Sequence, residues 1–131
     1  MCISIRRDRE IIELILDAPD KSANLLDRDF TRRFSEVLID LENEACYKGI
    51  IVRSNKKDFL AGADLSMMLQ AEHPEELMTW LGEFKAALRK LETFGKPVVA
   101  LIEGSALGGG YELALACHHR IVKNSSSIRI G

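Results

Sequence analysis

Glu112, which follows three contiguous glycines, is the residue of this chain best placed for acid–base chemistry. The glycines, residues 108–110, separate an apolar run of residues 98–102 from an apolar helical run. Backbone N–H groups in the first turn of a helix have no intrahelical acceptor, and glycines leave them unshielded. A carbonyl oxygen that gains negative charge during a reaction can bind there, beside a carboxylate that transfers a proton. The turn therefore predicts an anion-binding site next to an acid–base group.

Two other interpretations of a glycine-rich turn fail on the neighbouring residues. A phosphate-binding P-loop ends in Gly-Lys-Ser/Thr, whereas this turn ends in Gly110-Tyr111-Glu112. A dinucleotide fingerprint needs spaced glycines and a later acidic residue, and no Asp or Glu follows Glu112. A structural alternative stays open, in which the glycines only let the helix approach a neighbouring strand.

A second loop has the same organisation. Residues 49–53 contain the continuous β-branched run Ile50-Ile51-Val52, which predicts a buried strand, and residues 54–64 lead from it into a helix start. The Ala63 N–H is unencumbered, and Asp64 is of a type that caps helices. Two loops that each offer a backbone donor are what an oxyanion hole requires.

Both loops carry motifs of a known family. Residues 59–65 (FLAGADL) and 96–117 (KPVVALIEGSALGGGYELALAC) resemble the crotonase superfamily, the enoyl-CoA hydratases and isomerases. Residues 112–120 (ELALACHHR) are especially similar to the hydratase half of bacterial fatty-acid-oxidation multifunctional subunits. The resemblance extends over essentially the whole chain, and it covers about half of a crotonase domain.

The resemblance implies a site for a coenzyme A thioester, expected to be a 2-enoyl-CoA. The Ala63 and Gly109 N–H groups would hold the thioester oxygen, and Glu112 would transfer the proton. Coenzyme A would enter as part of the substrate, with no metal or redox cofactor in this segment. The substrate-binding positions that it implies are Ala23, Ala61, Gly62, Ala63, Leu65, Gly108 and Gly109.

The expected parent activity is hydration of 2-enoyl-CoA to 3-hydroxyacyl-CoA in fatty acid β-oxidation. The family's second glutamate follows a segment that resembles residues 128–131, and the chain ends at Gly131. Hydration uses two carboxylates in opposite protonation states, so we expect these residues by themselves to bind a thioester better than they hydrate it. The alternatives are double-bond isomerisation or other crotonase chemistry, and a non-catalytic CoA-binding or interaction fragment.

Glu112 also has a structural alternative. A carboxylate within a Leu- and Ala-rich helix is expected to be buried, and an unpaired buried carboxylate is costly. An ion pair with Arg120 or Arg53 would offset that cost.

Other polar and apolar side chains near the two loops are expected to have structural roles. His118 and His119 are expected at the negative C-terminal end of the same helix rather than in a metal site. Lys56 and Lys57 are expected in a solvated loop, with contact to the CoA phosphates as the alternative, and Met67 and Met68 are expected to line a pocket or fill the core.

The elements that must position these residues alternate between strand and helix, which predicts an α/β fold with crotonase-like repeated ββα units. Residues 3–7, 11–16, 98–102 and 120–123 are predicted strands around a turn-rich loop at 18–24. Apolar residues at helical spacing predict an amphipathic helix at 30–41 and another that starts at Pro74. The expected apolar face of that second helix is Leu77, Leu81, Phe84, Leu88 and Leu91, with Trp80 and Ala87 on its flank.

Composition fits one domain, residues 1–131, interpreted as a partial crotonase-fold domain. The chain has 131 residues, 47% of them hydrophobic, and a formal net charge of −2, which favours neither nucleic acid nor an anionic membrane as partner. No apolar stretch is long enough to span a bilayer. Three scattered cysteines indicate reduced thiols and a cytoplasmic protein. The family resemblance implies a trimer-based homo-oligomer.

Overall fold

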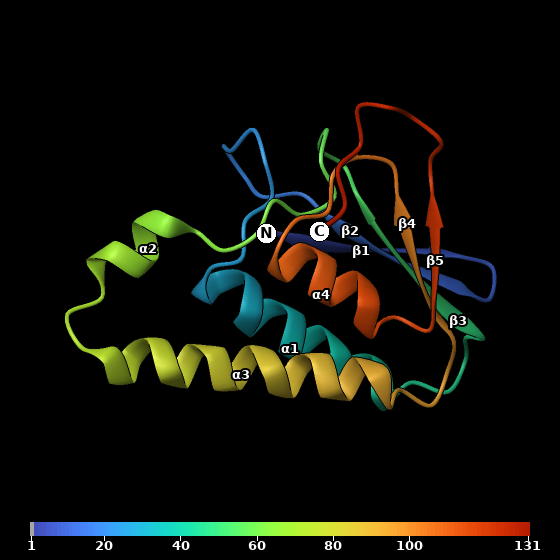
Figure 1. The fold of residues 1–131 in the computed structure, drawn as a ribbon. Coiled ribbons are helices and arrows are strands. Elements are labelled where there is room, and N and C mark those ends of the chain that lie inside the picture. Colours follow the sequence, from blue (N-terminus) through green and yellow to red (C-terminus); the bar gives the residue numbers. More distant parts are fainter. Residues whose placement is uncertain (1) are drawn as a thin grey trace.

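Five strands form one mixed sheet, and helices cover one of its faces (Figure 1). The computed structural model describes residues 2–131. The strand order is β1-β2-β3-β4-β5, with β1 antiparallel to β2 and all later neighbours parallel. The strands are β1 (Ile3–Asp8), β2 (Ile11–Leu16), β3 (Gly49–Ser54), β4 (Val98–Ile102) and β5 (His119–Val122). The predicted α/β class is confirmed, and so are the predicted strands to within one residue at each end.

Helix α1 (Arg28–Glu42) packs against α3 (Pro74–Glu92) on the covered face of the sheet. The Asp27 carboxylate caps α1 by accepting from the Phe30 N–H at 2.8 Å. The predicted apolar stripe of α1 is confirmed, because all of its members are buried: Phe30, Phe34, Val37, Leu38 and Leu41.

The predicted apolar face of α3 is partly wrong. Its buried stripe is Trp80, Phe84, Ala87 and Leu91. Leu81 was expected inside and is 41% exposed, whereas Trp80 was expected on the flank and is 3% exposed. The reason is a tertiary contact: the Trp80 indole N–H donates to the Thr31 hydroxyl of α1 at 2.9 Å, which turns this side of α3 inward.

A second, smaller set of parallel contacts lies beyond the ends of the strands. Isolated bridges join Leu26 to Ala63, Leu60 to Ala106, and Ala106 to Ile130. Each of these segments comes after a strand of the main sheet, so the chain repeats a strand, a short bridging segment and, for the first three, a helix. The segments joined by these bridges include the two loops in which the sequence predicts functional residues.

The remaining helices are α2 (Leu65–Gln70), which has no buried residue, and α4 (Gly109–Ala116). Helix α2 and the first turns of α3 extend away from the sheet in Figure 1. Among residues 2–131, no helix combines the length and the apolar character needed to cross a membrane.

Candidate functional site

The two loops with the predicted donors lie side by side beyond the carboxyl ends of β3 and β4. The Leu107 N–H donates to the Leu60 carbonyl at 3.0 Å, and the Phe59 N–H donates to the Ser105 carbonyl at 2.9 Å. Gly62 has a φ of +101°, which favours glycine, and a Cβ there would lie 3.3 Å from the Leu107 carbonyl oxygen. The structure thus brings together two segments that are more than forty residues apart in sequence.

The Ala63 N–H points away from the segment of Leu26, which flanks its loop. Leu26 donates its N–H to the Gly62 carbonyl at 2.7 Å and accepts from the Asp64 N–H at 2.9 Å. In an extended segment, successive backbone groups point to opposite edges, so the N–H of Ala63 is directed to the other side. Within residues 2–131 it donates to no acceptor. The predicted capping role of Asp64 is confirmed, because its carboxylate accepts from the Ser66 N–H at 2.9 Å.

Among the three glycines, the middle one has the unused N–H. Gly108 donates to the Gly131 carbonyl at 2.7 Å, and Gly110 donates to the Leu107 carbonyl at 2.8 Å. Gly109 is the first residue of α4, and within the part of the chain described here its N–H meets no acceptor. An unpaired N–H at a helix start favours an oxygen that carries negative charge.

The structural alternative for the glycines also holds. A Cβ on Gly110 would overlap the Leu60 carbonyl oxygen and lie 2.8 Å from its carbon. This close approach is needed for α4 to pack against the loop of Leu60. The packing requirement and the unused N–H belong to different glycines, so the two interpretations do not exclude each other.

Glu112 was expected to be buried, and it is exposed. The buried side of α4 is formed by Gly110, Leu113, Ala114 and Ala116. Glu112 lies on the opposite side, one turn after Gly108, together with the half-exposed Leu115. The carboxylate therefore faces solvent from the turn that bears the Gly109 N–H.

The alternative ion pair of Glu112 is wrong. Arg53 lies 3.1 Å from the Glu13 carboxylate. Arg120 donates to the carbonyls of Ala114 and Cys117 at 3.1 and 3.0 Å, so it caps the end of α4. Within residues 2–131, Glu112 belongs to no ion pair.

The other predicted binding positions surround the two loops. Ala23 and Ala61 are half-buried, and the Ala61 N–H donates to the Asn24 carbonyl at 3.0 Å. Leu65, at the start of α2, is 70% exposed. Lys57 is exposed, as expected for a solvated loop, but Lys56 is partly buried and lies 3.1 Å from the Asp17 carboxylate. Hydrogen bonds from Asn55 and Lys56 lower the pKa of Asp17.

Two residues, Asn24 and Leu26, organise this region, and the sequence did not predict this structural role for either; the family resemblance placed Asn24, like Ala23, only in the loop that approaches CoA. The Asn24 side chain, 2% exposed, accepts from the Ala18 N–H at 2.9 Å and donates to the Leu16 carbonyl at 3.1 Å and the Ser54 hydroxyl at 2.9 Å. Its place in a turn-rich loop was a weak signal, since asparagine side chains often bond to nearby backbone. Leu26 lies immediately before the cap of α1, and no local pattern distinguishes it.

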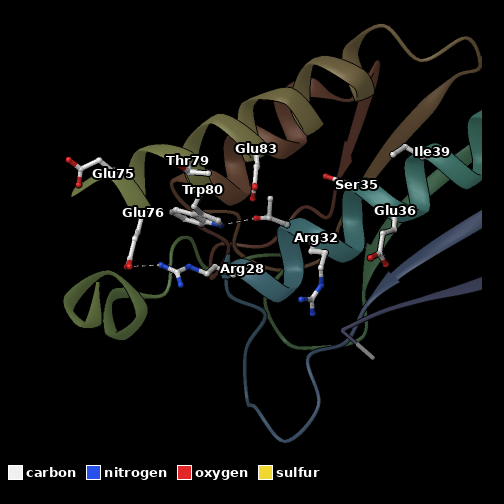
Figure 2. Close-up of a pocket in the computed structure, with 11 residues that line it drawn as sticks. Arg28, Arg32, Ser35, Glu36, Ile39, Glu75, Glu76, Thr79, Trp80 and Glu83 are labelled. Atoms are coloured by element: carbon white, nitrogen blue, oxygen red, sulfur yellow. Dashed lines mark hydrogen bonds and ion pairs between the residues drawn. The ribbon is translucent and has the colours of Figure 1, made fainter. Parts of the chain in front are cut away.

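A cavity with a volume of about 730 Å³ lies elsewhere, between α1 and α3. Figure 2 shows that charged side chains line it, including Arg28 and Glu76, which pair at 3.4 Å. Its lining includes none of the predicted site residues described in residues 2–131. No group of three or more His, Cys, Asp or Glu residues gathers in that part of the chain to hold a metal.

The chain matches known proteins over nearly its full length. The family model for enoyl-CoA hydratase/isomerase matches residues 6–130. The fatty acid oxidation complex subunits alpha of Shewanella frigidimarina and Shewanella baltica are 38% and 37% identical to it over 127 residues, which is 96% of this chain and 18% of each relative.

Solved structures agree with this match. The enoyl-CoA hydratase from Bacillus anthracis superposes with a TM-score of 0.90 at 28% identity, covering 99% of this chain and 50% of that one. The enoyl-CoA hydratase from Thermoplasma volcanium gives a TM-score of 0.89 at 26% identity, covering 100% of this chain and 51% of that one. The chain therefore spans about a fifth of the curated relatives' length and about half of these solved structures.

Proposed function

Because the chain belongs to the enoyl-CoA hydratase/isomerase family, we propose that its paired loops bind the carbonyl of an acyl-CoA thioester. The Ala63 and Gly109 N–H groups donate to the thioester oxygen, and Glu112 is the acid–base residue. The observation that supports this most directly is that the Ala63 and Gly109 N–H groups, which lie on two adjacent loops, meet no acceptor within residues 2–131.

The proposed reaction is hydration of a 2-enoyl-CoA. Water adds to the β-carbon, and the electrons of the double bond move toward the thioester, whose oxygen becomes an enolate oxyanion. Two preorganised donors stabilise that charge as it develops, and removal of one such donor typically lowers the rate by roughly 10²–10³. Coenzyme A takes part only as the activating group of the substrate.

Glu112 is proposed to hold the attacking water and accept its proton, while a second carboxyl group, protonated at the start of the reaction, gives its proton to the α-carbon. The family places a second glutamate after a segment that residues 128–131 resemble. The Gly131 carbonyl accepts from the Gly108 N–H at 2.7 Å, so residues joined to Gly131 in a longer protein would enter beside the glycine turn. That position suits a second carboxylate.

We also propose that copies of the protein associate, as the family resemblance implies, and that it works in the cytoplasm. The large apolar side chains left exposed on α2 and the first half of α3 fit an interface between copies, and they include Leu65, Leu69 and Met78.

The test is Glu112→Gln in the protein that contains this chain, with turnover of crotonyl-CoA followed by loss of the enoyl absorbance. Glutamine keeps the size and polarity of the side chain but cannot exchange a proton, so turnover should fall by about 10²–10⁴ with little change in thioester affinity. Glu103→Gln, at an exposed glutamate in the loop after β4, is the matched control and should leave turnover unchanged. Normal turnover with a lowered melting temperature in Glu112→Gln would assign the glutamate a structural role. Conversion of a 3-enoyl-CoA without hydration would assign an isomerase.

A further inference from the structure

We propose that Leu26 is the positioning residue that holds the two donor loops in their relative orientation, an inference that rests on the proposed function. Leu26 is 1% exposed and lies on neither loop. Its backbone contacts the loop of Ala63, and its side chain contacts the loop of Gly109.

The backbone of Leu26 fixes the direction of the Ala63 N–H. Its two hydrogen bonds, to the Gly62 carbonyl and from the Asp64 N–H, bracket Ala63 on both sides. With both neighbours turned toward Leu26, Ala63 must direct its own N–H to the opposite edge. A shift of Leu26 would therefore rotate this donor.

The side chain of Leu26 supports the start of α4. A methyl group placed on Gly109 would overlap the Leu26 Cδ1, so that carbon already fills the space over the Gly109 backbone. Phe84 of α3 closes the same space, with its Cε1 3.6 Å from that position. The Gly109 N–H is therefore held by packing against Leu26 and Phe84, in addition to the backbone bonds of Gly108 and Gly110.

Leu26 is itself held firmly. The next residue, Asp27, caps α1, and its carbonyl accepts from the Thr31 hydroxyl at 3.0 Å and the Trp80 indole at 3.3 Å. The helix pair α1 and α3 thus anchors Leu26. Because Leu26 contacts both loops, it fixes the position of the Ala63 N–H relative to the Gly109 N–H. Small displacements of preorganised groups are costly in catalysis, where about 1 Å can lower a rate by about 10²-fold.

The experiment compares Leu26→Ala, Leu26→Met and Leu41→Ala in the protein that contains this chain. Leu41 is the matched control because it is also a leucine with 1% exposure, and it lies near the far end of α1, about 20 Å along the helix axis. Both alanine variants should lose similar stability. Leu26→Ala should lower kcat about 10- to 100-fold with KM nearly unchanged, because the donors act mainly in the transition state. Leu26→Met should recover most of the rate, and Leu41→Ala should keep it.

A second readout is independent of turnover. A 3-ketoacyl-CoA forms an enolate that absorbs in the near ultraviolet, and the bound fraction in that form reports on the two donors without any need for Glu112. Leu26→Ala should lower this fraction, and Leu41→Ala should not. Equal effects of the two alanine variants on kcat and on the enolate band would overturn the role of Leu26 and leave the proposed function intact. Absence of the band in the unmodified protein, together with full turnover in Glu112→Gln, would overturn the proposed function and the role of Leu26 with it.

Discussion

His118 and Val98 are joined by two hydrogen bonds of opposite direction. The Val98 N–H donates to the His118 ring Nδ1 at 2.9 Å, and the His118 N–H donates to the Val98 carbonyl at 2.9 Å. Since Nδ1 accepts, Nε2 carries the proton and donates to the Glu92 carbonyl at 3.0 Å. The ring therefore connects the end of α3 with the start of β4, and Arg120 rather than His118 bonds to the terminal carbonyls of α4.

Replacement of the His118 ring should separate this acceptor role from simple packing. His118→Leu leaves the Val98 N–H without its partner and should lower the free energy of unfolding by about 1 kcal/mol. In His118→Asn the side-chain oxygen can take the place of Nδ1, so the loss should be smaller. Urea unfolding of both variants measures the difference, and equal losses would contradict the acceptor role.

Asn24→Ala should be among the most destabilising substitutions in the first loop. It removes the partner of the buried Ala18 N–H and the donors to Leu16 and Ser54, with an expected cost of about 3 kcal/mol in the free energy of unfolding. Asn55→Ala is the control, because that exposed side chain makes one bond, to Asp17 at 3.0 Å. Comparable urea midpoints for the two variants would show that the Asn24 bonds contribute little.

Two glycine-to-alanine substitutions should act in opposite directions. Gly110→Ala forces a Cβ against the Leu60 backbone, which cannot move aside as a flexible side chain does, and should cost about 1–3 kcal/mol. Gly82→Ala, in the interior of α3, meets nothing within 4 Å and should stabilise the protein by about 0.5–1 kcal/mol. Thermal unfolding gives both signs, and a neutral Gly110→Ala would exclude the close approach of α4 to the loop.

The Cys117 thiol should make the protein less stable at alkaline pH. Burial, partly offset by Arg120, raises the pKa of Cys117 from 9.0 to about 12. The unfolded chain therefore loses this proton first, so the stability present below pH 9 declines as the pH rises toward 12, by up to about 1.4 kcal/mol per pH unit. Cys117→Ala should flatten the dependence of stability on pH relative to the unmodified protein, and identical slopes would contradict this assignment.

The different exposure of the cysteines should also appear in their reactivity. A thiol reagent at pH 8 should modify the exposed Cys46 quickly and Cys117 only after unfolding.

Local patterns in the sequence determined most of the elements. Alternating and continuous apolar runs predicted the strands, helical spacing predicted the buried stripe of α1, and the residue type of Asp64 predicted its cap. These features depend on neighbours within a few positions, so they can be recognised without knowing what they pack against. The two glycine-bearing loops were likewise identified from their residues alone.

Tertiary structure decided which sides of those elements are covered and how the loops meet. The bond from Trp80 to Thr31 selected the buried side of α3, and packing of the opposite side of α4 left Glu112 in solvent. The parallel pairing of β3 with β4 brought the segment of Ala63 beside that of Gly109, and the bridge to Leu26 set the direction of the Ala63 N–H. These contacts join residues far apart in the chain, where no local periodicity records them, so only the folded chain specifies the geometry of the two donors.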